Sequence, residues 1–427
     1  MAVKRIRVIM EDGSHYDIRI GQRLLVNLGV HLRDALGEAE VTHAVVVGDE
    51  HTMQRFGKHA RTALEKAKFT VDTLTVPAGE ESKSIERAIE LWDAFAELGI
   101  GRDGVIVALG GGVVGDLAGF VASTWMRGVR YVQVPTSLLA MVDSSVGGKT
   151  AIDRPQGKNL VGTFTQPTYV AADLATLASL PDDEWENGFA EMCKSAMIDS
   201  EDFSVWLVEN AAGLMAHDSN AIQQAIVKTV SFKADIITHD EKEQGQRECL
   251  NYGHTFGHAL EKVAGYGTIS HGRAVAEGMR FAARLAVEVL EQEPDFCLAQ
   301  DALLDQMGLP ALDVPYPAAE LLDCMRSDKK VRGGKVRFVL VTNPGDWQVV
   351  EVPLETLQEH LEAWEASKGL EFDEEVNEDE ESEEMPPEAA DEVEELDEML
   401  VERAADEADD GAPTGATSSD DGEAAGK

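Results

Sequence analysis

The chain has 427 residues, enough for two domains of ordinary size, and its hydrophobic fraction of 44% can fill a sizeable core. Its net charge of −42 argues against nucleic acid as a partner, because that contact needs basic residues. No run of 18 apolar residues occurs, and charges interrupt the apolar runs at the N-terminus, so we expect neither a membrane span nor a signal peptide. Cys193, Cys249, Cys297 and Cys324 form no CxxC, which indicates reduced thiols in a cytoplasmic protein.

Residues 1–180 alternate short apolar runs with helical patterns. Buried strands are predicted at 43–50, 104–112 and 129–137, and a helix at 81–99. Such alternation is typical of a parallel sheet with helices on its faces. We therefore expect an α/β fold for the N-terminal domain, residues 1–180.

A glycine-rich turn, ALGGGVVGDLAGF, follows the second of these strands and opens a helix. Gly110, Gly112 and Gly115 satisfy GxGxxG, in which glycines let a pyrophosphate approach the backbone at a helix N-terminus. By itself, such a glycine-rich turn occurs about as often without a bound ligand as with one. The acidic residues Asp49 and Glu50, suited to ribose hydroxyls, precede the glycines here, whereas in a standard Rossmann unit the acidic residue follows them. We interpret the turn as the dinucleotide site of a Rossmann-like domain of unusual order.

Helical periodicity dominates after residue 180, with helices predicted at 182–197, 221–237 and 272–290. A β-like insert at 336–352 precedes a last helix at 354–367. These patterns predict a mainly α-helical second domain over residues 181–369. A small-molecule site is then expected in the cleft between the domains.

The segment 370–427 differs in composition from the rest. From Glu371 onward it carries 25 acidic and 2 basic residues and has few aromatic residues. Such a segment cannot bury enough apolar surface to fold, which predicts a disordered acidic tail that is dispensable for catalysis.

The segment LNYGHTFGHALE places His254 and His258 one helical turn apart. For a lone HxxxH, two hydrogen-bonded core histidines are the commoner explanation. His271 at a predicted helix start and Glu191 in the apolar stretch GFAEMCKSAM favour a Glu–His–His site for a catalytic divalent metal such as zinc, although Lys194 could satisfy Glu191 instead. His258 would then be left for proton transfer or for contact with an anion.

Cationic, amide and carboxylate side chains gather in several polar stretches. In so acidic a chain, loop cations near a metal helix predict a substrate with phosphate and carboxylate groups. For any single lysine a solvated surface position is the simpler explanation, less so for Lys149 in its glycine-rich loop VDSSVGGKTAID. The set comprises Arg127, Asp143, Lys149, Lys158, Asn159, Lys233, Glu243, Arg247, Asn251, Lys329 and Lys330.

These stretches together resemble the 3-dehydroquinate synthase family, over about residues 49–335. The matching motifs are GEESKS, GGGVVGDLAGF, PTSLLAMVDSSVGGKTAID, KNLVGTF, GFAEMCKSAM, DEKEQGQRECLNYGHTFGHALE, HGRAVAEGM and DKK. The resemblance implies an N-terminal domain that binds NAD, a helical domain that binds a divalent metal (zinc or cobalt), and a homodimer.

The resemblance also implies roles for individual residues. It implies the metal ligands Glu191, His254 and His271. It implies substrate-site residues at Asp143, Lys149, Lys194, Lys233, Glu243, Arg247, Asn251, His258 and Lys330, with Asn159 on the phosphate and Arg127 reaching the neighbouring subunit's site. It implies NAD contacts at Asp49, Glu80, Lys83, Gly111, Gly112, Asp116, Thr136, Ser137, Lys149, Lys158, Thr176 and Leu180.

The family reaction converts 3-deoxy-D-arabino-heptulosonate 7-phosphate (DAHP) to 3-dehydroquinate and phosphate. It proceeds by NAD-mediated oxidation, phosphate elimination, reduction, ring opening and intramolecular aldol closure, and serves the shikimate pathway to chorismate and the aromatic amino acids. NAD is regenerated in every turnover, so the enzyme is a lyase. The residues leave three alternatives open: another sugar phosphate cyclase, a metal-dependent polyol dehydrogenase, and a non-catalytic scaffold.

The match has departures at Met141, Asp153, Arg273 and Glu277, where the family usually has glutamine, asparagine, glutamate and isoleucine. Arg273 and Glu277 are four apart on a predicted helix. This spacing predicts an ion pair that turns the Arg273 cation away from the metal.

Overall fold

The computed structural model describes residues 2–327, 331–332 and 335–369, all within one compact unit, residues 1–370. The predicted acidic tail and the predicted site residue Lys330, with its neighbour Lys329, lie outside the described residues. Within the described ranges no helix is long and apolar enough to cross a membrane. The four cysteines are free thiols, as the sequence predicts.

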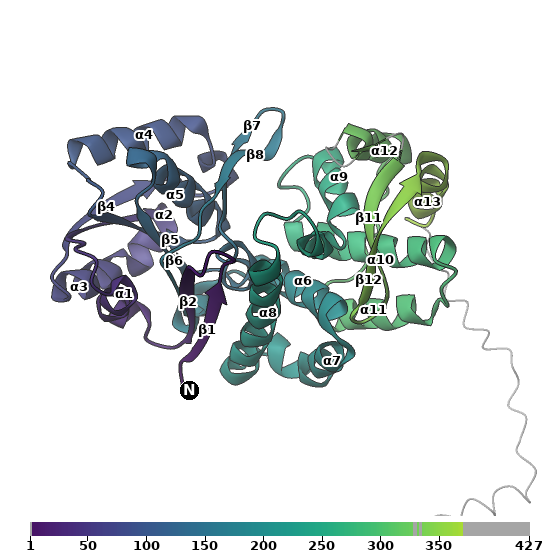
Figure 1. Cartoon of the computed structure of the whole chain (residues 1–427). Helices are drawn as coiled ribbons and strands as arrows, with labels where there is room; N and C mark the ends of the chain where they lie inside the picture. The colour runs from purple at the N-terminus through teal and green to yellow at the C-terminus, as the bar shows by residue number, and fades with distance from the viewer. Residues whose placement is uncertain (1, 328–330, 333–334, 370–427) are drawn as a thin grey trace, which may run out of the picture. The chain divides into compact units, whose positions relative to one another are not determined.

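A seven-stranded sheet forms the N-terminal half of this unit (Figure 1). Its order is β1-β2-β9-β6-β5-β3-β4, antiparallel between β1 and β2 and parallel elsewhere. The strands are β1 (Lys4–Ile9), β2 (His15–Gly21), β3 (His43–Asp49), β4 (Thr70–Val76), β5 (Gly104–Gly110), β6 (Arg130–Pro135) and β9 (Tyr169–Asp173). The three predicted strands are confirmed as β3, β5 and β6.

Helices cover both faces of this sheet because its buried strands are apolar on both sides. Val46 of β3 packs with α1 (Leu28–Leu36) and α3 (Lys58–Lys66). Its neighbours Val45 and Val47 point the other way and pack with α4 (Ile85–Glu97) and α5 (Gly112–Thr124). The predicted fold class of the N-terminal half, α/β with a parallel sheet, is confirmed.

Short helical turns link these elements. They are η1 (Leu25–Asn27), α2 (Glu50–Thr52), η2 (Met53–Gly57), η3 (Glu80–Ser82), η4 (Trp125–Arg127), η5 (Ala140–Ser144) and η6 (Leu174–Ser179). The helix predicted at 81–99 is therefore divided into η3 and α4. Ser84 is extended between them, and its hydroxyl accepts a hydrogen bond from Arg87 N, which caps the start of α4.

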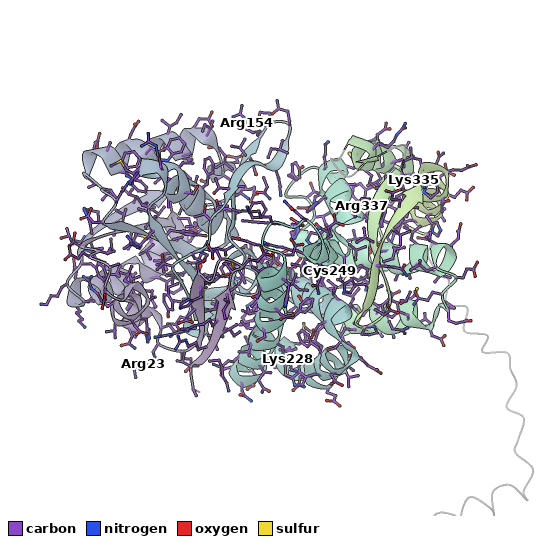
Figure 2. The ribbon with its side chains drawn as sticks, viewed as in Figure 1. Arg23, Arg154, Lys228, Cys249, Lys335 and Arg337 are labelled. Atoms are coloured by element: carbon purple, nitrogen blue, oxygen red, sulfur yellow. The ribbon has the colours of Figure 1, made fainter. Side chains whose placement is uncertain are left out.

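The segment predicted as a glycine-rich loop around Lys149 is instead a two-stranded antiparallel hairpin, β7 (Lys149–Arg154) and β8 (Gly157–Phe164). Figure 2 labels Arg154 at its outer end, where β7 leads into the turn. The apolar residues Ala151 and Ile152 are buried on β7, and this supports a strand that the neighbouring glycines obscure in the sequence.

The C-terminal half is mainly helical, as predicted. Its elements are α6 (Asp182–Asp199), α7 (Glu201–Met215), α8 (Ser219–His239), η7 (Gln246–Asn251), α9 (His254–Ala264), α10 (His271–Val289), α11 (Asp295–Gln306), α12 (Ala318–Ser327) and α13 (Leu354–Ala366). The predicted β-like insert is the hairpin β11 (Lys335–Asn343) and β12 (Asp346–Pro353), which β10 (Val331–Arg332) extends to three strands. A domain boundary near residue 180 stays a prediction.

Candidate active site

A cleft of about 2330 Å³ lies between the carboxyl ends of the parallel strands and the helices α6, α8, α9 and α10. Its wall includes Asp49 at the end of β3 and Gly111 at the end of β5, opposite His254 and His271. Most of the predicted site residues line it: Asp49, Glu80, Lys83, Gly111, Gly112, Asp116, Ser137, Asp143, Lys149, Lys158, Asn159, Lys194, Lys233, Glu243, Arg247, Asn251, His254, His258 and His271.

Glu191, which is described with the metal cluster below, and four other predicted residues are not part of the cleft wall. Thr136 is buried, and Thr176 is buried with its hydroxyl donating to Asp173 O (2.8 Å). Leu180 packs against the hydrophobic core. Arg127 is exposed at a turn where Met126, Arg127 and Gly128 all have positive φ. Contacts of these four with a cofactor or a second subunit stay predictions.

Glu191, His254 and His271 converge from three helices into one cluster. Glu191 Oε1 lies 3.5 Å from His254 Nε2 and 3.8 Å from His271 Nε2. Each residue offers one ligand atom, and these three atoms all lie within 4.8 Å of one another. Glu191 is buried and its Oε2 is ion-paired with Lys194, whereas its Oε1, the oxygen nearer the two histidines, has no hydrogen-bond partner among the residues described. A buried carboxylate oxygen that accepts no hydrogen bond, beside two imidazole nitrogens, fits a divalent metal.

The histidine tautomers also fit a metal. His254 Nδ1 lies 3.0 Å from Tyr252 O, and His271 Nδ1 lies 3.2 Å from Glu261 Oε2. A proton on each Nδ1 would satisfy these acceptors and leave each Nε2 lone pair facing Glu191.

The pKa shifts indicate where positive charge is favoured. Burial, followed by the charges of Lys194, His258 and His271, holds the pKa of His254 well below its usual range, which keeps this ring neutral as a ligand must be. Burial also opposes a charge on His271, but Glu191 and Glu261 outweigh it and raise the pKa of His271 to about 9. The carboxylates thus favour a positive charge at His271, and a bound metal would supply it in place of the proton.

A close contact between α9 and α10 sets the spacing of the two histidines. Gly253, at the N-terminus of α9, has φ +76°, and a Cβ there would lie 2.6 Å from Val275 O. A Cβ on Gly278 would lie 1.9 Å from Gly253 O. Only glycine allows this approach without strain. The glycines of NYGH and EGM are therefore required for the packing of the two helices, in addition to being part of the family motifs.

The cations of the cleft are held by carboxylates and carbonyls. Lys233 Nζ donates to Asp143 O and Asp143 Oδ1, both at 2.6 Å, and Lys149 pairs with Glu243. Arg247 Nη2 donates to Gly147 O (3.1 Å), while its Nε has no partner among the described residues. Burial lowers the pKa of Lys233, and Asp143 only partly offsets it. Such pre-positioned cations can bind an anionic substrate with little reorganisation.

The side of the cleft that is predicted to bind the dinucleotide is built on the start of α5. Gly111 is the N-cap of this 13-residue helix, and its lack of a side-chain cap leaves backbone N–H groups facing the cleft. The buried Lys83 donates to Asp116 Oδ2 (2.8 Å) on α5 and to Asn159 Oδ1 (2.5 Å) on the hairpin. The glycine turn, Lys83 and the hairpin therefore form one side of the cleft.

The chain matches two consecutive family models. The model described as "3-dehydroquinate synthase N-terminal" matches residues 73–187, and "3-dehydroquinate synthase C-terminal" matches residues 188–331, together more than half of the chain. The chain belongs to the 3-dehydroquinate synthase family. The 3-dehydroquinate synthase of Caulobacter vibrioides is 44% identical over 346 residues (78% of this chain, 90% of the relative), and that of Rhodopirellula baltica is 42% identical over 327 residues (76% and 87%).

Solved structures share the fold of this family member. A 2-deoxy-scyllo-inosose synthase, described as complexed with carbaglucose-6-phosphate, NAD⁺ and Co²⁺, aligns with a TM-score of 0.77 at 24% identity, covering 84% of this chain and 99% of the other. The 2-epi-5-epi-valiolone synthase ValA from Streptomyces hygroscopicus aligns at 0.73, also at 24% identity, covering 85% and 98%. An iron-containing alcohol dehydrogenase from Thermotoga maritima aligns at 0.57 and 13% identity, covering 86% and 100%.

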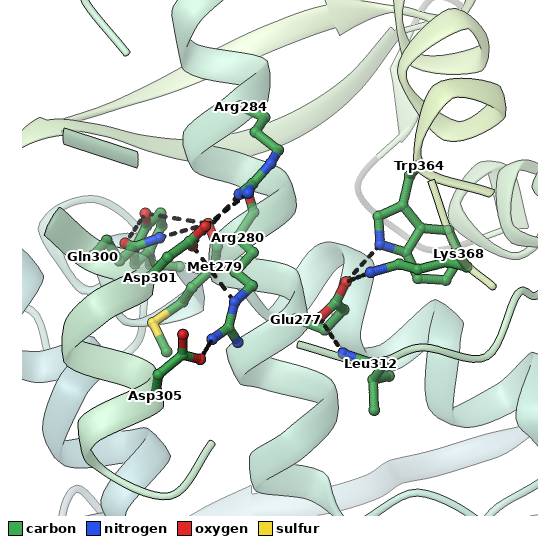
Figure 3. Close-up of polar contacts among 11 residues, drawn as sticks. Glu277, Met279, Arg280, Arg284, Gln300, Asp301, Asp305, Leu312, Trp364 and Lys368 are labelled. Atoms are coloured by element: carbon green, nitrogen blue, oxygen red, sulfur yellow. Dashed lines mark hydrogen bonds and ion pairs between the residues drawn. The ribbon is translucent and has the colours of Figure 1, made fainter. Parts of the chain in front are cut away.

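The predicted ion pair between Arg273 and Glu277, two departures from the usual family sequence, is wrong. Arg273 Nε bonds Glu186 Oε2 (3.0 Å) on α6. The buried Glu277 accepts from Trp364 Nε1 (2.6 Å), Lys368 Nζ (2.5 Å) and Leu312 N (3.1 Å), as Figure 3 shows. Each side chain finds its partner across a packing contact with another element, which helical spacing alone does not reveal.

Two organising carboxylates of this family member were not assigned from the sequence. Asp240, just after α8, accepts hydrogen bonds from the backbone N–H groups of Gln244, Gly245 and Arg247 at 2.8–2.9 Å, and so shapes the loop that presents Glu243 and Arg247. Glu261 bonds His271. The signal for Asp240 is an aspartate at a helix end before a glycine, which is typical of a side-chain-capped turn.

Proposed function

We propose that this chain is a 3-dehydroquinate synthase that converts DAHP to 3-dehydroquinate and phosphate, in the shikimate pathway to chorismate and the aromatic amino acids. The observation that carries the proposal is a single cleft whose wall includes His254 and His271 of the Glu191–His254–His271 cluster, the glycine turn before α5 and a set of buried cations. Family membership over both halves of the chain supports it.

The cofactors that we propose are NAD and a divalent metal, zinc or cobalt. Glu191, His254 and His271 would hold the metal. The proposed NAD contacts are Asp49, Glu80, Lys83, Gly111, Gly112, Asp116, Thr136, Ser137, Lys149, Lys158, Thr176 and Leu180. When bound, NAD accepts a hydride and returns it, and the metal polarises the reacting oxygen. Two observations support the fit of these groups: Glu191 Oε1 has no hydrogen-bond partner among the described residues, and the start of α5 has no side-chain cap.

The chain's own residues bind and orient the substrate. Lys194, Lys233, Arg247 and Lys149 supply the positive charge that a phosphate and a carboxylate need, and Asn159 adds an amide donor. Before the substrate arrives, Asp143 holds Lys233 and Glu243 holds Lys149, and the Asn251 amide donates a hydrogen bond to Glu243. Lys330 and the partner-facing Arg127 complete the proposed anion set.

His258 is proposed to take the proton from the hydroxyl that is oxidised. Its ring centroid lies 5.2 Å from that of His254 and 6.1 Å from that of His271, so it borders the metal cluster within the cleft. A neutral imidazole at this position can act as a general base. Phosphate itself can serve as the base of the elimination step, so no protein base is required there.

The remaining parts of the proposal concern the assembly. We propose an NAD-binding domain at 1–180, a metal- and substrate-binding domain at 181–369 and an acidic tail at 370–427. We further propose a cytoplasmic homodimer that binds neither nucleic acid nor membrane. Gel filtration with light scattering of the full chain tests the dimer, since a monomer at micromolar concentration would contradict it.

Substrate choice tests the proposal against another sugar phosphate cyclase. The purified chain with NAD and zinc is given DAHP or glucose 6-phosphate, and released phosphate is measured. Phosphate release from DAHP alone is expected, because Arg247, Lys233 and Asn251 suit a substrate carboxylate that glucose 6-phosphate lacks. Turnover of glucose 6-phosphate in place of DAHP would contradict the assignment.

A further inference from the structure

Glu261 lies where the metal cluster meets the β7–β8 hairpin. It is a buried residue of α9, one turn after His258, and it lines the cleft. Its Oε2 lies 3.2 Å from His271 Nδ1, and its Oε1 lies 3.4 Å from Lys158 Nζ on β8. The two oxygens of one carboxylate therefore contact two residues from different halves of the chain.

The contact with His271 decides which nitrogen of that ring is available. An ionised carboxylate only accepts hydrogen bonds, so it selects the tautomer or charge state with a proton on Nδ1. Nε2, 3.8 Å from Glu191 Oε1, is then the atom that faces the cluster. Metal-binding histidines commonly have such a carboxylate on the opposite nitrogen, and it fixes the ring and raises its basicity.

The contact with Lys158 links the same carboxylate to the hairpin. Lys158 Nζ also lies 4.5 Å from the ring centroid of Tyr266, so the lysine is held by two groups of the helical half. Its neighbour Asn159 accepts a hydrogen bond from Lys83 on the dinucleotide side. The hairpin is thus anchored to both sides of the cleft by consecutive residues.

We propose that Glu261 is a positioning residue for the metal site: it holds His271 with Nε2 presented to Glu191 and His254, and it anchors the hairpin through Lys158. This inference rests on the metal-dependent function proposed above. Glu261 acts through His271. Among the contacts described, it has none with Glu191 or His254, the other two proposed metal ligands.

One rival explanation uses the same residue as a ligand. His258, Glu261 and His271 also offer ligand atoms within 4.8 Å of one another. A second ion there would need Nδ1 of His271, and a first ion already needs Nε2, so the shared imidazole would have to lose both protons. A hydrogen bond from Nδ1–H needs no such state, and we therefore favour the positioning role.

The test is zinc affinity, measured by competition between the full-length chain and a chromophoric chelator with Zn²⁺ alone. Glu261→Gln keeps the shape and an acceptor oxygen but removes the charge, and should weaken zinc binding about 10–100-fold. The matched control is Glu186→Gln, which removes a charge from the same cleft wall at a residue that contacts Arg273 and not a histidine. It should bind zinc like the unmodified chain.

One further reading and one backup variant make the outcome decisive. The visible spectrum of bound Co²⁺ should change in Glu261→Gln and stay the same in Glu186→Gln, which a loss of global stability would not produce. If Glu261→Gln does not fold by circular dichroism, Glu261→Asp, too short to reach His271, is measured in the same way and should show the same loss. Unchanged zinc affinity in a folded Glu261 variant would overturn the proposal, as would two zinc ions per chain falling to one in Glu261→Gln.

This titration contains neither DAHP nor NAD. Zinc affinity therefore reports on Glu261 even if the chain proves inactive on DAHP, and activity on DAHP reports on the proposed function even if Glu261 proves dispensable. Failure of one and failure of the other are thus distinguished.

Discussion

Glu277 is predicted to fasten the last helix, α13, onto α10. Replacing it by glutamine leaves the side-chain volume but removes the charge that Lys368 and Trp364 both contact. Lys368 is buried by 92% at its side chain, so its ammonium would be left largely desolvated. Breaking a buried ion pair from one side costs about 3–5 kcal/mol. We take about 3 kcal/mol, because Lys368 lies near the end of the helix and can turn toward water.

Hydrogen exchange of α13 peptides measures this locally. A loss of about 3 kcal/mol in the opening free energy corresponds to a roughly hundredfold loss of protection, at about 1.4 kcal/mol per tenfold. Glu359→Gln, an exposed position on α13, is the matched control and should change opening by less than about 0.5 kcal/mol.

A double-mutant cycle isolates the contact between the two charges. Glu277→Gln and Lys368→Met should couple by about 0.5–3 kcal/mol, because the second substitution removes a charge that the first has already left unpaired. Additive effects, within about 0.5 kcal/mol, would refute the idea that the two charges stabilise one another across the helices.

The remaining predictions concern the cleft and the tail. Asp240→Asn should raise KM for DAHP with less effect on kcat, because one amide oxygen cannot replace a carboxylate that accepts three backbone N–H groups; an unchanged KM would contradict this role. Burial opposes ionisation of Asp240, but these hydrogen bonds outweigh it and lower the pKa of its carboxyl. The stabilisation of the loop by Asp240 is therefore present above pH 3.8 and is lost as the pH falls through the lowered pKa. Hydrogen exchange of the loop, measured against pH, can follow this loss. His254→Ala should abolish stoichiometric zinc binding, measured by elemental analysis after dialysis, and near-full metal content would exclude it as a ligand. Truncation after Lys368 should leave kcat unchanged and should lower KM slightly, only at low salt. At low salt the repulsion of the anionic substrate by a tail of net charge −23 is least screened. A collapse of kcat would contradict the prediction that the tail is dispensable.

Local patterns were sufficient for much of the fold. The length and the apolar composition of the run HAVVVGD are typical of a strand buried on both faces, and this run forms β3. The helices α6, α8 and α10 follow from periodicity in the same way. The strand character of Lys149–Arg154 was not visible, because glycines and charges flank it and its partner β8 is mostly exposed.

Contacts between elements were the part that the sequence could not give. Motif resemblance named Glu191, His254 and His271, and the fold brings them together. It did not name Glu261 or Asp240, whose roles depend on which groups lie opposite them. For the same reason helical spacing misassigned Glu277, since Trp364 and Lys368 are about 90 residues away in the chain.

The most direct test of the central claim is the stoichiometry of NAD in the presence of DAHP. The full-length, zinc-loaded chain is incubated with excess DAHP and a small amount of NAD, and phosphate, 3-dehydroquinate and NADH are followed together. We predict many phosphates and an equal amount of 3-dehydroquinate per NAD, no net NADH, and loss of all turnover with a strong chelator. NADH that accumulates one for one with product would identify a dehydrogenase instead and contradict the account.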